Sequence, residues 1–222
     1  MRRFMNEELF LSLVALAAAG VSPNIFPAAQ AGVAKMSVLA VTLLIPSVVL
    51  LAVVFAIAAY RCHPRLASRL LGGAAAGIVA TVALEVVRIA SFRLGGMPGD
   101  LPRLMGVLLT DRFMLGPSLV SDFFGYAYHF WNGACFGVIF AVLFGRRKLI
   151  WAVGYGALIG LGFLASPAVK AMGVGFMGTQ MPTMIVTIVI AHLAYGLVLG
   201  ALLRRWLPDD GWLGSPLLQE VA

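Results

Sequence analysis

The sequence contains few charged residues for its length, and this scarcity limits the kinds of protein that it can encode. Only 11% of its 222 residues are Asp, Glu, Lys or Arg, whereas 61% are hydrophobic and the mean hydropathy is +0.98. An average soluble domain has about a quarter charged residues and could not bury so much apolar surface. These values exclude a disordered chain and an ordinary soluble enzyme, and they predict a polytopic membrane protein.

Cysteine is also scarce, which excludes a secreted scaffold held together by disulfides. The chain has two cysteines, Cys62 and Cys135, and their spacing matches neither a zinc knuckle nor a redox C-x-x-C motif. Because they are expected at different depths in the membrane, we do not expect them to pair with each other. The sequence also lacks a Walker motif, a dinucleotide-binding fingerprint and an H-E-x-x-H motif.

Long apolar segments are abundant, and six of them are long enough to cross a bilayer. A helix needs about 20 mostly apolar residues for one crossing. The six segments cover residues 10–30, 36–60, 67–94, 123–145, 149–169 and 183–203. We therefore predict an all-α integral membrane protein, with residues 1–222 forming a single transmembrane domain built as a six-helix bundle.

The basic residues lie mainly on one side of this predicted bundle. Ten of the sixteen flank the same ends of the segments: Arg2, Arg3, Arg61, Arg65, Arg69, Arg146, Arg147, Lys148, Arg204 and Arg205. Cytoplasmic loops carry an excess of Lys and Arg, so both termini are predicted to be cytoplasmic. The same rule explains the net charge of +7. We expect the lipid bilayer as partner and no nucleic acid, and a homo-oligomer or a larger membrane complex stays open.

The first apolar segment has a second interpretation, as a signal peptide. Two arginines precede it, and Ala29-Gln30-Ala31 resembles a cleavage site. Glu7 and Glu8 are unusual in such a leader. Cleavage would leave five spans with the same orientation.

The longest predicted external connection, residues 95–121, contains an amphipathic helix. Apolar residues recur there at intervals of three and four: Leu101, Leu104, Met105, Leu108 and Leu109. Asp100 is the predicted N-cap, and Pro102 lies in the first turn. We expect this helix to lie in the membrane interface or to cover the mouth of the bundle.

Glycine is common, and four of the predicted spans contain the motif G-x-x-x-G. In lipid, this motif lets helix backbones approach each other closely. The four copies are Gly73/Gly77, Gly133/Gly137, Gly156/Gly160 and Gly196/Gly200. In the last four spans, the order G-x-x-x-G, Met-Pro, H-x-x-x-G-x-x-x-G occurs twice. We therefore predict a duplicated helix hairpin, its copies related by an axis along the membrane normal.

Ionisable side chains inside the predicted spans are rare, and such residues indicate a functional site. Glu85, His129 and His192 belong to three different spans, each ~10–13 Å from the external end at 1.5 Å per residue. We predict that they form one buried site in the outer half of the bilayer. Neighbouring polar residues are expected to support it: Arg88, Tyr126, Asn132 and Tyr195.

A simpler interpretation of these residues also stays open. Glu85 and Arg88 are three residues apart in a helix and can neutralise each other. Each histidine can then be an ordinary hydrogen-bonded group between helices, without a shared ligand.

Three functions are compatible with a Glu/His site of this kind. The first is the binding or transport of an ion, a metal or a small ligand. The second is a redox subunit, in which the imidazoles ligate haem b, or two histidines and a carboxylate hold a transition metal. The third is a structural accessory subunit of a larger membrane complex. We expect a protein of one of these kinds rather than an enzyme.

Two short motifs resemble a family of small uncharacterised bacterial membrane proteins. Residues 129–133 (H-F-W-N-G) match its H-x-x-x-G helix, and residues 191–196 (A-H-L-A-Y-G) match its final A-H-x-x-Y-G helix. The resemblance covers about residues 72–203 and implies a multi-pass protein of the bacterial inner membrane. It implies no particular activity.

The chain also has a distant likeness to rhomboid proteases, which have six spans, an H-x-x-x-N helix and a late A-H-x-x-G helix. The serine motif of that family, G-x-S-x, is missing, because Ser166 has no flanking glycines. Asn132 is three residues after His129 rather than four. We therefore do not expect proteolytic activity.

Overall fold

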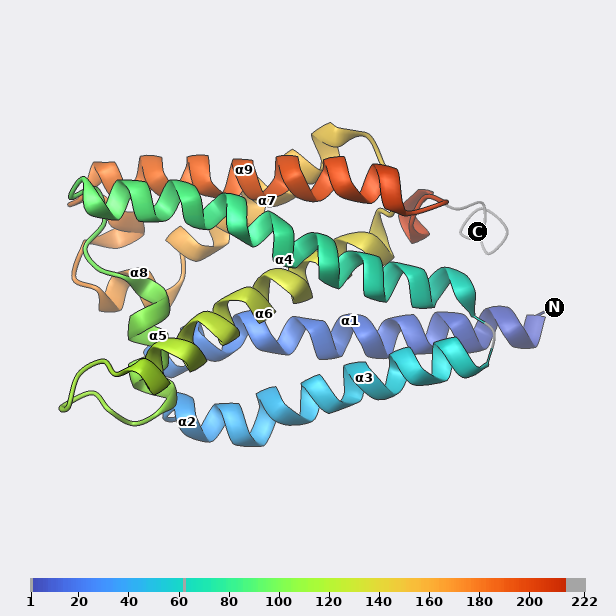
Figure 1. The fold of residues 1–222 in the computed structure, drawn as a ribbon, viewed down its shortest axis with the longest axis horizontal. Helices are drawn as coiled ribbons and strands as arrows, with labels where there is room; N and C mark the ends of the chain where they lie inside the picture. The colour runs from blue at the N-terminus through green and yellow to red at the C-terminus, as the bar shows by residue number, and fades with distance from the viewer. Residues whose placement is uncertain (1, 62, 215–222) are drawn as a thin grey trace.

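The computed structural model describes residues 2–61 and 63–214, and these form a bundle of α-helices joined by short connections (Figure 1). Its long helices are α1 (Arg2–Gln30), α3 (Ile45–Tyr60), α4 (Pro64–Arg93), α6 (Leu119–Leu143), α7 (Leu149–Leu164) and α9 (Pro182–Trp206). The shorter elements are α2 (Met36–Leu39), the π-helical turn η1 (Ala40–Leu44), α5 (Leu101–Leu109), α8 (Pro167–Ala171), η2 (Phe176–Gly178) and η3 (Trp212–Gly214). Among the described residues the β-structure is limited to an isolated bridge between Gly145 and Asp210.

Five helical segments are long and apolar enough to cross a membrane. They are Asn6–Gln30, Met36–Tyr60, Pro64–Arg93, Leu119–Leu143 and Pro182–Trp206. Apolar side chains also cover their outward faces: Val86 is 65% exposed and Val186 is 57% exposed. Such a surface is unfavourable in water and favourable in lipid. The predicted class, an all-α membrane-embedded protein, therefore agrees with the structure.

The fifth predicted span, residues 149–169, differs from the structure. Helix α7 ends at Leu164 and has 16 residues, which span only ~24 Å at 1.5 Å per residue. The residue before a proline is biased away from helical geometry, and Ser166 before Pro167 is extended, with ψ at 156°. The described helices therefore include five of spanning length rather than six, and the six-span bundle stays a prediction.

The other predicted boundaries are close to the observed ones. The segment 36–60 is continuous, but its first part contains the π-helical turn η1, just before Pro46. Proline has no N–H to bond the carbonyl four residues earlier, and a π-helical turn adjusts the backbone around this gap. Helix α1 begins at Arg2 rather than at residue 10.

Glycines bring the helices together in two separate pairs. An added Cβ at Gly77 of α4 would meet the carbonyl oxygen of Gly133 in α6. One at Gly156 of α7 would meet the carbonyl oxygen of His192 in α9. The G-x-x-x-G motifs thus face each other in both pairs, as the motif predicts for helices in lipid. The duplication of the hairpin itself stays a prediction.

The predicted amphipathic helix is present as α5, and it packs against α6. Gly106 and Gly125 allow this approach, because an added Cβ at Gly106 would meet the carbonyl oxygen of Ser121. Asp100 occupies the N-cap position, but its side chain makes no capping hydrogen bond. Its carboxylate instead contacts Arg88, a charged partner that interacts more strongly than a backbone N–H.

Helix α1 contains Pro23 and Pro27 and is completed by a side chain from another helix. The hydroxyl of Tyr128 in α6 accepts a hydrogen bond from the backbone N–H of Phe26 (3.1 Å) and donates one to the carbonyl of Ser22 (2.8 Å). It therefore stands between two backbone groups that would bond each other in a regular helix. This insertion fixes α1 against α6.

The start of α1 and the end of α9 lie at the same end of the bundle (Figure 1). At this end the buried Arg69 of α4 binds the segment after α9, through the side chain of Asp209 (3.1 Å) and the carbonyl of Asp210 (2.7 Å). Cys135 is free and buried in α6, whereas Cys62 lies outside the described residues.

Candidate functional site

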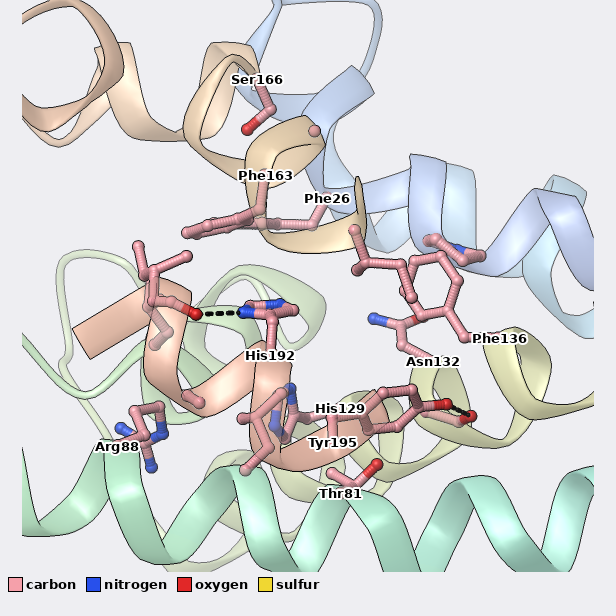
Figure 2. A pocket seen from close by; sticks show the side chains of 18 of the residues that line it. Phe26, Thr81, Arg88, His129, Asn132, Phe136, Phe163, Ser166, His192 and Tyr195 are labelled. Carbon is pink, nitrogen blue, oxygen red and sulfur yellow. Dashed lines mark hydrogen bonds between the residues drawn. The ribbon is translucent and has the colours of Figure 1, made fainter. Parts of the chain in front are cut away.

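A cavity of about 540 Å³ lies between α1, α4, α6, α7 and α9, in the half of the bundle away from the chain ends (Figure 2). It exists because α1 packs on α6 while α7 packs on α9, which leaves room between the two pairs. Most of its lining is apolar, and five aromatic side chains contribute: Phe26, Phe136, Tyr155, Phe163 and Tyr195. Arg88, His129 and His192 also line it, and we call these three residues the polar wall.

A buried ionic network stands behind the polar wall. Arg88 binds Glu85 through two hydrogen bonds: Nε donates to Oε1 and Nη2 donates to Oε2, each at 2.6 Å. Nε2 of His129 lies 3.0 Å from Oε1 of the same carboxylate. Glu85 therefore connects α4 with α6 and fixes the His129 ring beside the cavity.

The network continues toward the end of the bundle that carries α5. Nη1 of Arg88 lies 3.1 Å from Oδ1 of Asp100, and Nη2 donates a hydrogen bond to the Tyr126 hydroxyl at 3.4 Å. That hydroxyl donates to Oδ2 of Asp100 at 3.2 Å. The carboxylates of Glu85 and Asp100 thus both face the guanidinium of Arg88, which compensates part of their negative charge, as burial in a low dielectric requires.

A second ion pair holds α5 to α6 outside this network. Arg103 binds the carboxylate of Asp122 at 3.1 Å. The hydrogen bond to this carboxylate raises the pKa of the Arg103 guanidinium above its ordinary value. Both side chains are partly exposed, so the pair positions α5 but contributes little to stability.

His192 belongs to the polar wall but not to the ionic network. Its Nδ1 is 2.8 Å from the carbonyl oxygen of Ile188, one turn earlier in α9. A carbonyl only accepts, so Nδ1 carries the proton, and Nε2 of the neutral ring presents a lone pair. Within the part of the chain that the structure describes, Nε2 has no hydrogen-bond partner. The ring packs on Gly160, where an added Cβ would lie only 3.1 Å from it.

The remaining polar residues around the cavity mostly bind the protein itself. The hydroxyl of Tyr195 donates to the carbonyl of Gly133 at 2.7 Å, and that of Tyr155 donates to the carbonyl of Phe136 at 3.1 Å. Oδ1 of Asn132 accepts a hydrogen bond from Ser22. The two tyrosines therefore offer ring surface to the cavity rather than hydroxyl groups.

The predicted convergence of Glu85, His129 and His192 occurs only in part. Glu85 and His129 are in contact, and both histidines line one cavity, but Nδ1 of His192 binds Ile188. Among the described residues, no group of three or more His, Cys, Asp or Glu side chains could hold a metal ion. The structure therefore does not support a metal site with two histidines and Glu85, whose two carboxylate oxygens both accept hydrogen bonds from Arg88, and that site stays a prediction.

The haem b alternative receives no support from this geometry either. Bis-histidine ligation needs two imidazoles that offer nitrogens to each other across an open gap. Nε2 of His129 instead faces Oε1 of Glu85.

The predicted supporting residues have two different roles. Arg88 and Tyr126 join the ionic network. Asn132 and Tyr195 form hydrogen bonds that hold α6 to neighbouring helices.

Some residues of the site are absent from the sequence prediction. Asp100 was assigned to a helix cap, whereas it completes the charge network. Tyr128 and, apart from Tyr195, the aromatic residues of the lining are also absent from the predicted site, because buried aromatics at helical spacing are common in any bundle. Pro23 and Pro27 of α1 also line the cavity.

Ser166 also lines the cavity, at the break after α7. Its hydroxyl is buried without a hydrogen-bond partner within residues 2–61 and 63–214. It is not paired with either histidine, so the arrangement of a serine protease is not formed there.

Helices of spanning length, packing through glycine and a buried charge network together define a helical membrane protein with an internal cavity. Residues 67–211 of the chain match the family of unknown function DUF6789, and the chain belongs to this family. This match includes Glu85, Arg88, His129 and His192, and it agrees with the predicted likeness to an uncharacterised family. No curated protein and no solved structure matches the chain.

Proposed function

We propose that this protein binds a membrane-soluble amphiphile in the cavity, with the polar head of the ligand at the polar wall and its apolar body among the aromatic side chains. The observation that carries this proposal is the cavity of about 540 Å³ with its apolar and aromatic lining and its polar residues on α4, α6 and α9. Pockets for small molecules have this size and this combination of a mainly apolar lining with a few fixed polar groups.

Access from the lipid supports a ligand of this kind. Leu158 of α7 lines the cavity and is 65% exposed, and the exposed residues Asn24 of α1 and Gly162 of α7 also line it. The cavity is therefore bordered by exposed residues of both α1 and α7. An amphiphile can enter laterally there without crossing water.

The polar wall is suited to hold a head group in one orientation. Arg88 and His129 are fixed by Glu85 and Asp100, so their positions do not depend on the ligand. A prearranged site binds more tightly than one that must be ordered by its ligand. Binding of an amphiphile therefore fits this geometry better than binding of a bare ion or a metal.

The orientation in the membrane follows from the basic residues. Their accumulation at the end of the bundle with the chain ends supports cytoplasmic termini in a bacterial inner membrane. The cavity would then open in the outer half of the bilayer.

The test compares two glycine substitutions in α7. An added Cβ at Gly162 or at Gly154 meets no atom within 4 Å, but only Gly162 lines the cavity. Gly162→Phe should fill the cavity, and Gly154→Phe is the matched control. Native mass spectrometry of protein extracted in mild detergent should show a bound molecule in wild type and in Gly154→Phe, and none in Gly162→Phe. Equal adducts in all three proteins, or none in wild type, would contradict the proposal.

A further inference from the structure

The groups of the cavity that remain free for hydrogen bonding indicate which head group it accepts. This argument rests on the proposed function and concerns the chemistry of the same site. Two residues with hydroxyl groups on the lining, Thr81 and Thr187, donate to carbonyls one turn earlier in their own helices, at 2.8 Å and 2.7 Å. The hydroxyls of Tyr155 and Tyr195 donate to backbone carbonyls of α6. These four donors are therefore unavailable to a ligand, whereas the Ser166 hydroxyl at the break after α7 has no partner among the described residues.

The guanidinium of Arg88 also interacts with groups of the protein itself. It binds Glu85 and the Tyr126 hydroxyl, and it also contacts Asp100. An anionic head would have to compete with two carboxylates for this group. A carboxylate or phosphate head is therefore disfavoured in spite of the arginine and the two histidines.

His192 offers the clearest free group. Its Nε2 presents a lone pair without a partner within residues 2–61 and 63–214, and the ring lines the cavity. Figure 2 shows it between His129 on one side and Phe26 and Phe163 on the other. A lone pair at this position calls for a ligand that donates a hydrogen bond.

Asn132 on α6 also lines the cavity, but its amide has partners within the protein. Its Oδ1 accepts from Ser22, and its side chain also interacts with the Tyr128 hydroxyl. The lone pair of His192 is therefore the group that selects the polar head of the ligand, and a hydroxyl group can donate to it.

The aromatic lining indicates the shape of the head. Phe26, Phe136 and Phe163 contribute rings to the cavity, and the tyrosines at 155 and 195 contribute ring surface. Aromatic rings interact favourably with another ring in offset or edge-to-face arrangements. We infer that the cavity binds an amphiphile with a hydroxylated aromatic head, that is, a lipid-soluble phenol or quinol, whose hydroxyl donates to Nε2 of His192.

Two probes that differ by one methyl group on the phenol oxygen separate this inference from simple apolar binding. 4-Decylphenol has the hydroxyl group, whereas 4-decylanisole carries a methyl ether that cannot donate. Equilibrium dialysis between micelles with and without protein measures their affinities under equal partitioning. One net hydrogen bond corresponds to about a 3- to 10-fold preference, and wild type should prefer the phenol by this factor.

Substitutions of His192 assign the preference to a residue. His192→Leu should abolish the preference for the phenol while leaving the affinity for the anisole within about a factor of two. His192→Asn, which retains an acceptor oxygen, should restore part of the preference. Thermal unfolding of each variant in the same detergent checks that it is folded.

The possible outcomes distinguish this inference from the proposed function. If both probes bind equally and Gly162→Phe prevents both from binding, the cavity is an amphiphile site without the phenol preference, and the inference is wrong. If neither probe binds while the adduct seen by mass spectrometry still depends on Gly162, the inference is again wrong but the proposed function stands. A preference for the anisole, or a phenol preference that persists in His192→Leu, would also overturn the inference.

Discussion

Nε2 of His129 lies 3.0 Å from Oε1 of Glu85, and this contact joins the helix that carries the buried ion pair to the helix that faces the cavity. Glu85 is 5% exposed and already binds Arg88 through both oxygens. The contact therefore extends a structural ion pair to a residue that a ligand can reach. In this way the charge network and the cavity become parts of one site.

The buried network should be sensitive to the loss of its single arginine. Arg88→Met leaves Glu85 and Asp100 without their cation, and breaking a buried pair in this way costs about 3–5 kcal/mol. The double variant Glu85→Gln/Arg88→Met should lose less, because one of the two uncompensated charges is gone. Thermal unfolding in detergent measures the loss of stability in both variants, and Arg93→Met, at an exposed position, is the control. A double variant less stable than the single one would contradict this account.

Alanine substitutions at two glycines of α7 should change the stability of the protein in opposite directions, because one glycine faces α9 and the other faces open space. Gly156→Ala puts a methyl group against the carbonyl of His192, and such overpacking costs about 1–3 kcal/mol. Gly154→Ala meets open space, and it should stabilise the helix by up to about 1 kcal/mol. Unfolding temperatures of the two variants are compared with wild type. If Gly156→Ala is as stable as Gly154→Ala, the close packing of α7 on α9 is wrong.

The hydroxyl of Tyr128 should contribute to the stability of α1. Tyr128→Phe leaves the N–H of Phe26 and the carbonyl of Ser22 without their bridging group, which costs about 2 kcal/mol. The matched control is Tyr60→Phe, because Tyr60 is 88% exposed. Hydrogen exchange at Phe26 should become faster only in Tyr128→Phe. Unchanged exchange there would show that the hydroxyl does not complete the helix.

The orientation of the bundle can be tested by labelling single cysteines in a background without Cys62 and Cys135. Cysteines introduced at positions 64 and 149, on the predicted cytoplasmic side, should not react with an impermeant reagent in intact cells. Cysteines at the exposed positions Phe113 and Phe176 of the opposite end should react. Reaction at 64 and 149 from outside would reverse the predicted topology.

The helices themselves were predictable because their signals are local. Apolar length located four of the five long segments to within a few residues at each end; the other, α1, starts earlier than predicted because its polar N-terminal residues also form helix. The spacing of the leucines and Met105, at intervals of three and four residues, predicted the position of α5. The end of α7 was missed even though Pro167 is present, because apolar composition continues past the break.

For the site, the sequence predicted which residues take part but not how their side chains are arranged. Counting residues along each helix gives the depth of Glu85, His129 and His192, but it does not give the direction in which each side chain points. The contact between Nδ1 of His192 and the carbonyl of Ile188 depends on the side-chain rotamer of His192, which its spacing along the chain does not fix. The role of Asp100 and the insertion of Tyr128 depend on packing between distant segments.

The central claim is that the cavity holds an amphiphile, and photochemical crosslinking tests it most directly. A phenol with a diazirine in its alkyl chain is irradiated with the protein in detergent, and the labelled residues are mapped by mass spectrometry, with and without excess 4-decylphenol. The account predicts labelling at cavity residues such as Ile159 and Phe163 that the competitor suppresses, and labelling at the outward-facing Val86 and Val186 that it does not. Labelling confined to the outward-facing positions, or unaffected by competitor everywhere, would contradict it.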